Sequence, residues 1–516
     1  MYLVWHTTNL IALKIYLMIR KFNMEFITFP LIVFIILYAF IILKKFIQNS
    51  NKKYPPGPCY IPIIGNSYLI KRYCMKYGGL HNALMQLCTK YRSDIIGFNL
   101  SGKYVVAIQN DELCDEALLK DELLGRPDSF FIKLRSMGTN KGITMTNGDL
   151  WQEQRAFAMK HLRNLGFGKK IMENLIKEEI QMCIENIESD SINVNFKATI
   201  SKCVVNVLWA FVTGSRFQRD ELLDELISIM TERSKAFDMA GGMLSQFPWI
   251  RFIAPEASGY NLIKKLNYKL KCIISGTIEE HKKTYSQNIT RDFIDAFLHE
   301  MYKTRNGPTT FTEDQLIMVC VDLFIAGSVT TSSKIDFLIV QMLVNRDVQQ
   351  NVYEEISKIL KPGEIASLLH KDQMPYVNAV ILENDRMYPI TPVIGPRNVL
   401  AETTLGGYTL PKDTTVLINL WTSSRNENKW KNPDKFCPMR FLKCNEEKKV
   451  LFTFGKGKRR CPGEILAKNF IYLFFTSLIN NFQIENGNKE VESIKVLPGM
   501  LLTAQPYEVK LIRRHI

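Results

Sequence analysis

The most informative segment of the chain reads FGKGKRRCPG and covers residues 454–463. It leads a cysteine, Cys461, out of a glycine-rich loop to the start of an apolar, helix-compatible stretch that begins at Ile465. The N-terminus of a helix and nearby cations stabilise a thiolate, which is the form of cysteine that binds a metal. The segment therefore predicts a metal-ligating cysteine.

Two other kinds of site do not fit this segment. A phosphate-binding loop requires G-x-x-x-x-G-K-[ST], which the sequence lacks. A zinc site requires several ligands at characteristic spacings, and Cys437, Cys444 and Cys461 have neither such spacings nor a nearby histidine. Neither a nucleotide-binding loop nor a zinc cluster is therefore expected.

Residues 312–345 predict one long helix. Thr312, Glu313, Asp314 and Gln315 form a capping box ahead of an apolar stretch that continues to about Asn345. At 1.5 Å per residue this helix is roughly 50 Å long, so most of it must be buried. Its middle, AGSVTT at 326–331, favours helix weakly. Either a ligand needs room there, or small residues allow a close helix crossing.

Most other segments after residue 80 have helical periodicity. Hairpins are expected at 95–108, around Ser101-Gly102, and at 399–418, around Gly406-Gly407. The predicted class is mainly α with small β-sheets.

Composition excludes several classes of protein. The chain has 516 residues, of which 46% are hydrophobic and 23% charged, as in packed globular proteins. Its 66 basic and 51 acidic residues give a net charge of +15, which favours an anionic membrane, an acidic partner or nucleic acid. We expect no nucleic acid, because no binding motif is present. The eleven cysteines form no C-x-x-C pair, which indicates a reducing compartment.

The N-terminal region predicts a membrane anchor. Residues 26–46 form an apolar span without charge up to Leu43, long enough to cross a bilayer. A cleaved signal peptide is the alternative, but its apolar core is usually shorter and followed by small residues. Lys44, Lys45, Lys52 and Lys53 place the following chain in the cytosol, although Arg20 and Lys21 upstream compete with that orientation. We expect a tail and anchor at 1–53 and one catalytic domain at 54–516.

The segment at 454–463 also matches F-x-x-G-x-R-x-C-x-G at every fixed position, namely Phe454, Gly457, Arg459, Cys461 and Gly463. This motif resembles the haem-thiolate loop of the cytochrome P-450 family. Further family-like segments follow in family order: E-x-x-R at 383–386, an arginine segment at 438–441 and W-x-x-x-R at 151–155. The chain looks like the animal microsomal members, and residues 142–168 resemble insect methyl farnesoate epoxidases.

The resemblance implies the family fold, with a long central helix over a haem, and haem b bound through Cys461 as the ligand of its iron. It implies these cofactor-binding positions: Phe454, Gly457, Arg459, Cys461, Gly463, Trp151, Arg155 and Arg397. Among them, Trp151 and the arginines are expected to contact the haem propionates. Glu383, Arg386 and Arg440 are expected to form a structural network that braces the haem loop.

The resemblance also implies the catalytic positions Thr330, Ser328 and Gly327, with Thr330 as the oxygen-handling threonine. Position 329 departs from the family pattern, because Val329 stands where an acid is usual. Proton delivery is therefore in question, and Ser328 or ordered water is the expected substitute.

The implied activity is that of a monooxygenase that inserts one atom of O2 into a lipophilic substrate, by hydroxylation or epoxidation. Electrons are expected from NADPH through a reductase that docks on Lys456, Lys458 and Arg460, with cytochrome b5 as a further donor. The alternative for these cations is a solvated surface. The implied location is the endoplasmic reticulum membrane, with the catalytic domain facing the cytosol.

The expected substrate pocket draws on residues 130–143, 323–331, 390–394 and 500–502, which are mostly apolar. The aromatic segment 247–253 is expected to dip into the membrane surface, with interior packing as the alternative. Two other functions stay open: a haem-thiolate isomerase or dehydratase, and a haem-binding protein without catalysis.

Overall fold

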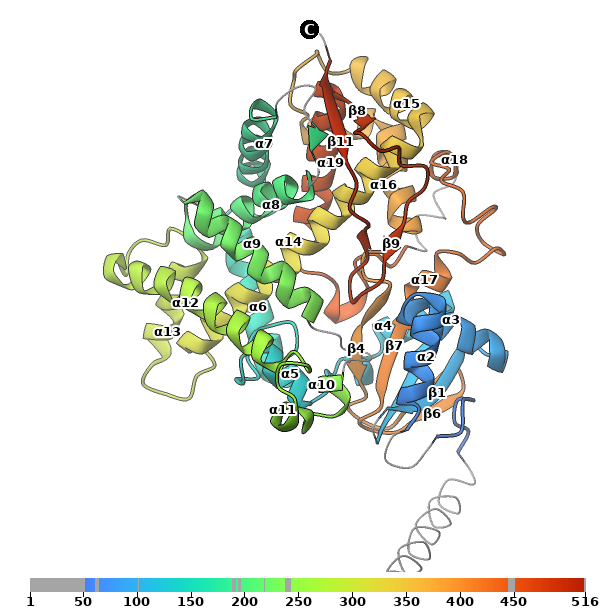
Figure 1. Ribbon diagram of the computed structural model, residues 1–516. Coiled ribbons are helices and arrows are strands. Elements are labelled where there is room, and N and C mark those ends of the chain that lie inside the picture. Colours follow the sequence, from blue (N-terminus) through green and yellow to red (C-terminus); the bar gives the residue numbers. More distant parts are fainter. Residues whose placement is uncertain are drawn as a thin grey trace, which may run out of the picture. The chain divides into compact units, whose positions relative to one another are not determined.

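The computed structural model describes residues 52–60, 65–100, 102–187, 192–193, 196–217, 219–236, 243–443 and 451–514 (Figure 1). The chain divides into two units, of which the smaller comprises residues 1–54 and 407–409. In its described part, the N–H of Thr409 donates to the carbonyl oxygen of Lys53 at 2.7 Å. The larger unit, residues 55–406 and 410–516, contains the site. The membrane span predicted at 26–46 lies outside the described residues.

Helices make up most of the larger unit, which confirms the predicted class. The first helices are α2 (Ser67–Tyr77), α3 (Leu80–Tyr91), α4 (Asp111–Leu119), α5 (Phe130–Arg135), α6 (Gly148–Asn164), α7 (Lys170–Glu185), α8 (Phe196–Thr213), α9 (Asp220–Ala236), α10 (Met243–Gln246) and α11 (Ile250–Ile253). The others are α12 (Tyr260–Thr284), α13 (Phe293–Thr304), α14 (Glu313–Val344), α15 (Arg346–Ser357), α16 (Pro375–Met387), α17 (Leu420–Ser423), α18 (Arg440–Lys443) and α19 (Glu464–Asn481).

The strands are short and form small sheets. They are β1 (Ile95–Leu100), β2 (Lys103–Ile108), β3 (Ile192–Asn193), β4 (Val393–Asn398), β5 (Thr403–Leu405), β6 (Tyr408–Leu410), β7 (Thr415–Asn419), β8 (Phe482–Asn486), β9 (Val496–Leu497), β10 (Thr503–Ala504) and β11 (Val509–Arg513). One sheet has the order β1-β2-β7-β4, a second the order β3-β11-β8, and a third pairs β10 with β9.

The first predicted hairpin is confirmed, with Ile95 opposite Ile108 in the antiparallel pair of β1 and β2. The second predicted hairpin, at 399–418, is wrong in its length. Strands β5 and β6 flank Gly406-Gly407, but β7 runs parallel to β2 and antiparallel to β4 instead. Val416 and Ile418 of β7 are completely buried. Their partners lie far away in the sequence, so local alternation could not reveal this pairing.

The long helix α14 runs through the core and packs against α8, α16 and α19 (Figure 1). It covers Glu313–Val344, as predicted. The Thr312 hydroxyl caps it by accepting from the N–H of Gln315 at 3.3 Å. The second half of the capping box is absent from the part of the chain described here. The Gln315 side chain instead bonds both backbone groups of Gly142, each at 3.1 Å.

Two described helices, α8 and α14, are long and apolar enough to cross a membrane. In each of them, 72% of the most apolar window is buried inside the protein. These helices therefore owe their composition to the core, since a helix that is apolar on all sides is buried.

Candidate active site

The loop before α19 holds Cys461 in a defined position. Gly457 has a φ of +68°, and a Cβ there would lie 2.6 Å from the carbonyl oxygen of Leu118, so only glycine fits. The N–H of Cys461 donates to the carbonyl oxygen of Phe454 at 2.9 Å. Gly463 is the N-cap of α19, and a Cβ there would lie 4.0 Å from the Cys461 sulfur. The loop thus presents the sulfur at the helix start, with open space beside it.

The electrostatics of the thiol are mixed. Burial raises the pKa of Cys461, because the thiolate loses solvation, and Glu464 raises it further. The N–H of Gly463 and the guanidinium groups of Arg155 and Arg460 lower the pKa. The predicted stabilising groups are therefore present, but burial outweighs them in the protein alone. The side chain remains open to solvent on one side, and a metal ion bound there would favour the thiolate.

Four guanidinium groups gather near the cysteine loop. Burial and mutual repulsion lower the pKa of Arg459 to about 9 and that of Arg397 to about 10. Burial also lowers the pKa of Arg155 and, well below its ordinary value, that of Arg126. The Arg459 guanidinium lies 3.7 Å from the ring centroid of Trp151. Such a cluster of like charges requires anions.

The hydrogen bonds of this cluster point to the same need. Arg459 donates to the carbonyl oxygens of Leu124 and Thr146, at 3.1 and 2.7 Å. These oxygens are neutral and leave the positive charge uncompensated. The buried Nε of Arg397 has no hydrogen-bond partner among the described residues. The two carboxylates of a haem fit this donor set, because guanidinium groups bind carboxylates in a matching geometry.

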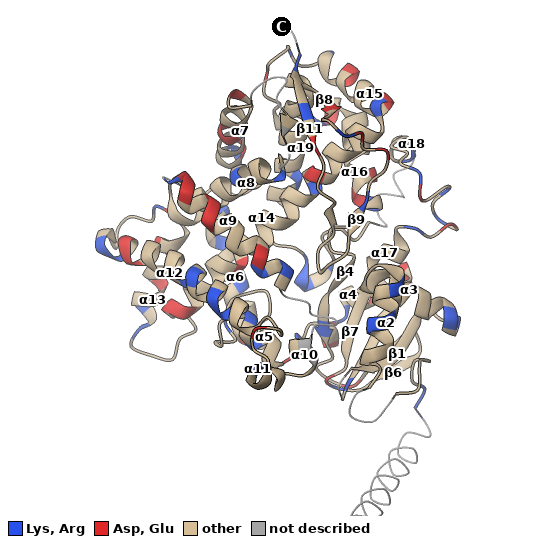
Figure 2. Cartoon of the chain, in the orientation of Figure 1, with Lys and Arg blue, Asp and Glu red and all other residues tan. Residues whose placement is uncertain are grey.

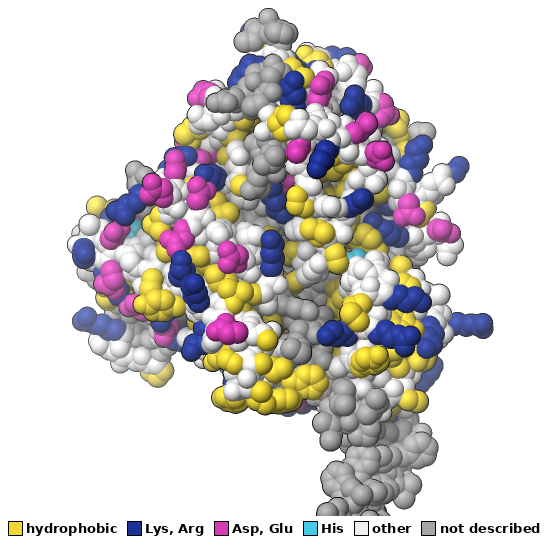
Figure 3. Space-filling model, viewed as in Figure 1, with side chains coloured by type: hydrophobic (Ala, Val, Ile, Leu, Met, Phe, Trp, Pro, Cys, Tyr) yellow, Lys and Arg dark blue, Asp and Glu magenta, His cyan; other side chains and the backbone are white. Residues whose placement is uncertain are grey.

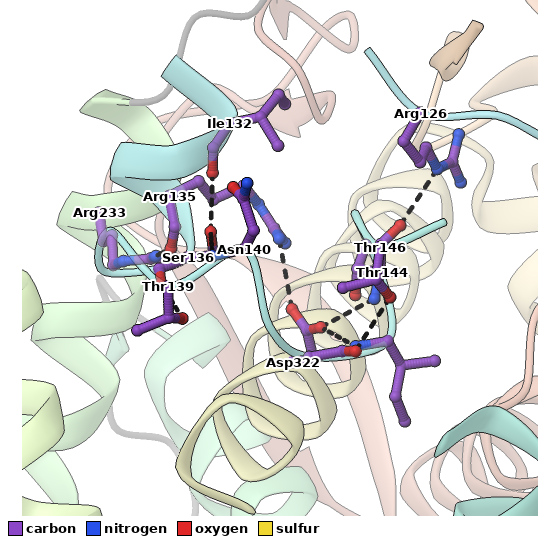
Figure 4. Close-up of polar contacts among 12 residues, drawn as sticks. Arg126, Ile132, Arg135, Ser136, Thr139, Asn140, Thr144, Thr146, Arg233 and Asp322 are labelled. Carbon is purple, nitrogen blue, oxygen red and sulfur yellow. Dashed lines mark hydrogen bonds and ion pairs between the residues drawn. The ribbon is translucent and has the colours of Figure 1, made fainter. Parts of the chain in front are cut away.

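Arg126 was missed by sequence reasoning, because it lies in no recognisable motif. Its guanidinium donates to the carbonyl oxygen of Thr144 at 3.1 Å (Figure 4). It also donates to the carbonyl oxygen of Pro396 at 2.8 Å. It therefore joins the loop before α6 to strand β4, which carries Arg397.

Asp322 of α14 was missed as well, although it is a charged residue inside an apolar helix. Its carboxylate accepts from the N–H groups of Ile143 and Thr144, both at 2.8 Å, and from Arg135 at 3.3 Å (Figure 4). A Cβ on Gly142 would lie 2.5 Å from the same carboxylate. Asp322 thus fastens the end of the predicted pocket loop to α14.

Glu383, Arg386 and Arg440 are in direct contact. Arg386 donates to both oxygens of Glu383, at 2.8 and 2.9 Å, and neither side chain is exposed to solvent. Arg440 donates to the same carboxylate at 3.1 Å, and the N–H of Cys437 does so at 2.8 Å. One buried carboxylate therefore joins α16 to the segment that precedes the cysteine loop.

The middle of α14, residues 326–330, is less buried than the stretches on either side of it. The Thr330 hydroxyl donates to the carbonyl oxygen of Ala326 at 2.7 Å, and Ser328 is buried. A Cβ on Gly327 would lie 2.7 Å from a methyl group of Leu208. Gly327 therefore allows the close crossing of α14 and α8, while Ala326 and Thr330 border open space.

A cavity of about 1590 Å³ lies beside α14. Each of the four segments predicted to line the pocket contributes to it: Phe130–Ile132, Ser328 and Val329, Pro392–Ile394, and Met500 and Leu501. Cys461 and Thr330 are not among the described residues that line the cavity. Ser328, one of the three predicted catalytic positions, lines the cavity, and so does Val329, the neighbour of Thr330 in the chain.

Comparison with known proteins identifies the architecture. The family model described as Cytochrome P-450 matches residues 55–511. The chain belongs to the cytochrome P-450 family. It is 37% identical over 478 residues to the probable cytochrome P-450 305a1 of Drosophila melanogaster, covering 90% of this chain and 95% of that protein. It is 34% identical over 481 residues to human cytochrome P-450 2J2, covering 90% and 92%.

A third relative is the farnesoate epoxidase of Bombyx mori, 30% identical over 486 residues, covering 92% of this chain and 96% of that protein. The predicted family is confirmed, and with it the class of haem-thiolate monooxygenases. Haem with cysteine thiolate ligation is the cofactor of this family, and Cys461 is the cysteine at the matching position.

The cations predicted to dock a P-450 reductase are each paired with an acid. Lys456 bonds Asp115, Lys458 lies 2.6 Å from Asp121, and Arg460 lies 2.5 Å from Glu464. Lys458 and Arg460 keep about 60% of their side chains exposed. The surface is therefore less positive than the sequence suggests, but it remains accessible.

Proposed function

We propose that the protein is a membrane-anchored monooxygenase that takes electrons from NADPH through a reductase and oxidises a lipophilic molecule. The observation that carries this proposal is the position of Cys461 at the start of α19, with Trp151, Arg155, Arg397 and Arg459 gathered near it. One thiolate and several guanidinium groups suit a haem, which offers one iron and two carboxylates.

The protein residues would divide the work as follows. Arg126, Arg155, Arg397 and Arg459 would bind the propionates, and burial would strengthen these ion pairs. The Trp151 indole packs under Arg459 and orients it. When bound, the haem would supply activation of O2 by two electrons and cleavage of the O–O bond, which a thiolate ligand favours.

The loop and its support keep the sulfur in place. Gly457 permits the tight approach to Leu118, and Gly463 leaves room beside the sulfur. Phe454 anchors the loop through its carbonyl oxygen. Behind the loop, the ion pairs of Glu383 with Arg386 and Arg440 would brace the segment that leads into α18.

The residues of α14 would handle protons and oxygen. The Thr330 hydroxyl borders open space and can hold a proton donated from the cavity side. Ser328 lies at the cavity wall, and Gly327 acts indirectly by allowing the helix crossing with α8. Val329 cannot carry a proton, so delivery must come from another group.

The cavity supports a lipophilic substrate. Phe130, Phe131, Val393, Ile394 and Leu501 give it apolar walls, which favour burial of hydrocarbon. Similarity to a protein named farnesoate epoxidase supports hydroxylation or epoxidation of a terpenoid-like molecule.

Contact with the endoplasmic reticulum membrane is supported by an apolar patch. Trp249, Phe252 and Ile253 are exposed to 56%, 75% and 75%, which disfavours the alternative of interior packing. Yellow side chains gather at the lower edge of Figure 3, below the place of α11 in Figure 1. Together with the span predicted at 26–46, this patch would hold the catalytic domain against the cytosolic face.

Val329 supports a second candidate, a haem-thiolate isomerase or dehydratase that rearranges a peroxide without external oxygen. Such an enzyme needs neither NADPH nor a reductase. Product formation that persists without both would favour it, whereas product formation that requires both supports the monooxygenase.

The first experiment tests the ligand. In the Cys461→Ser variant, the reduced, carbon monoxide-bound protein is expected to lose the thiolate-type Soret band. Cys272→Ser is the matched control, because Cys272 is exposed on α12. A Cys461→Ser protein that keeps the band would overturn the assignment.

The second experiment tests the substrate. The purified protein is titrated with methyl farnesoate, lauric acid, progesterone and 7-ethoxycoumarin, and Soret shifts are recorded. Compounds that shift the band are then incubated with reductase, NADPH and O2. We expect an oxygenated product from at least one of them, and unchanged spectra throughout would contradict a lipophilic substrate.

A further inference from the structure

The apolar helix α14 carries three charged side chains between residues 315 and 344, and all three are buried. In Figure 2 the helix is accordingly mostly tan. Asp322 binds the loop at 143–144, and Lys334 pairs with Asp385 of α16. Both have partners that explain them as parts of the framework. The third, Asp336, differs because it lies in the wall of the cavity.

The surroundings of Asp336 keep its carboxyl group close to neutrality. Burial raises its pKa to about 6, against the opposing effects of Lys197 and Tyr507. The Tyr507 hydroxyl donates to one carboxylate oxygen at 2.9 Å. The Lys197 ammonium of α8 lies 3.9 Å from the other oxygen, which is too far for a hydrogen bond. This carboxyl group can therefore both bind and release a proton in the physiological range.

Other charged groups face the same cavity. Helix α9 contributes Asp224, Glu232 and Lys235, and Lys235 repels Lys197. Asp224 pairs with Lys202 at 2.8 Å, and Glu232 is exposed. These groups lie at the solvent side, so the cavity connects Asp336 with a hydrated, charged surface.

Asp336 lies on one stripe of α14 with two other cavity residues, Val329 and Ser332. Their spacing, i, i+3 and i+7, puts all three on the same helix face. The Ser332 hydroxyl lies 2.8 Å from the carbonyl oxygen of Ser328 and 3.3 Å from that of Val329. Asp336 is about 10 Å from Val329 along the axis, at 1.5 Å per residue. Ser332 and water in the cavity can bridge this distance.

We propose that Asp336 is the proton-relay residue of this enzyme and takes the place of the acid that is missing at position 329. The inference rests on the proposed monooxygenase function. In that reaction, O2 receives two electrons from NADPH through the reductase and two protons from bulk water. One oxygen atom enters the substrate, and the other leaves as water. Asp336 passes a proton inward through cavity water and Ser332, and it regains one from the solvent side.

The test separates proton delivery from substrate binding. Wild type, Asp336→Asn and Glu232→Gln are supplied as holoenzymes with the compound of the panel that the wild type oxidises fastest. Each is driven either by NADPH and reductase or by cumene hydroperoxide, which brings oxygen in its reduced, protonated form. Glu232→Gln is the matched control, because it removes a carboxylate from the same cavity at its exposed side.

We expect Asp336→Asn to form about a hundredfold less product per NADPH, at the lower end of the range typical of proton-transfer groups, and to keep its hydroperoxide-driven rate. Adding Val329→Glu to this variant should restore product per NADPH. Equal loss in both assays would assign Asp336 to substrate binding or folding, and no loss in either would also overturn the proposal. A wild type that oxidises no panel compound with NADPH would count against the proposed function instead.

Infrared spectroscopy tests the relay without turnover. We expect the wild-type protein to show a carboxyl C=O band that disappears as the pH rises through about 6, shifts in D2O, and is absent from Asp336→Asn. Exchange in D2O shows that the buried proton reaches solvent through the cavity. A band that fails to titrate, or fails to exchange in the folded protein, would overturn the relay whatever the substrate is.

Discussion

Replacing Glu383 by glutamine should destabilise the protein severely. The carboxylate is fully buried and accepts two bonds from Arg386, one from Arg440 and one from the N–H of Cys437, all between 2.8 and 3.1 Å. Glutamine preserves the shape but removes a negative charge that is in direct contact with two guanidinium groups. Breaking a buried ion pair from one side costs about 3 to 5 kcal/mol. Against a typical stability of about 5 to 15 kcal/mol, this is a large fraction.

Urea unfolding followed by circular dichroism measures this cost, and it can be done without added haem because the network is made by protein side chains alone. The control is Glu116→Gln, which removes an exposed i,i+4 pair with Lys120 and should change the unfolding free energy by less than about 0.5 kcal/mol. Haem content of the purified variant is a second readout, since the network supports the cysteine loop. A loss below about 1 kcal/mol for Glu383→Gln would show that the buried carboxylate contributes little to stability.

Three further predictions concern Gly327 and Asp336 of α14 and Phe252 of α11. Gly327→Ala should cost about 1 to 3 kcal/mol by overpacking against Leu208, and adding Leu208→Ala should recover part of that cost in a double-mutant cycle of thermal unfolding; additive losses would exclude the contact. Because the pKa of Asp336 rises from 3.8 to about 6 on folding, the folded state binds more protons between these values. The unfolding free energy should therefore fall by about 2 kcal/mol as pH rises from 4 to 6, and Asp336→Asn should flatten this slope in urea titrations. Finally, Phe252→Ser should weaken binding of the protein to phospholipid vesicles in sedimentation assays, and unchanged binding would remove this exposed residue from the membrane contact.

Local sequence was sufficient wherever the physical signal is local. The turn at residue 457 requires glycine, and the start of α14 at Thr312 requires a capping residue. Both can be recognised from a few neighbouring residues of the sequence. The same holds for the spacing of Glu383 and Arg386, which puts both side chains on one helix face. Glycine and charged residues at fixed spacings in the sequence were therefore enough to predict the cysteine loop and the Glu383–Arg386 ion pair.

Other features depend on residues that are distant in the chain. The parallel pairing of β7 with β2 joins residues about 310 positions apart, as in the register of Val106 with Val416. Arg126 and Asp322 belong to no motif, and only the folded chain brings them to Thr144. Hydrophobic periodicity cannot predict such contacts, because neither partner stands out within its own segment of the sequence.

Sequence alone was enough to predict the family, the mainly helical class, Cys461 as the candidate metal ligand and the apolar character of most of the pocket. Three features became visible only in the folded protein: Gly327 allows a helix crossing, Lys456, Lys458 and Arg460 are each paired with an acid, and Asp336 lies in the wall of the cavity. The physical reason is that propensity, capping and spacing act over a few residues. Burial, pKa and charge compensation depend instead on everything that folding brings within a few ångströms.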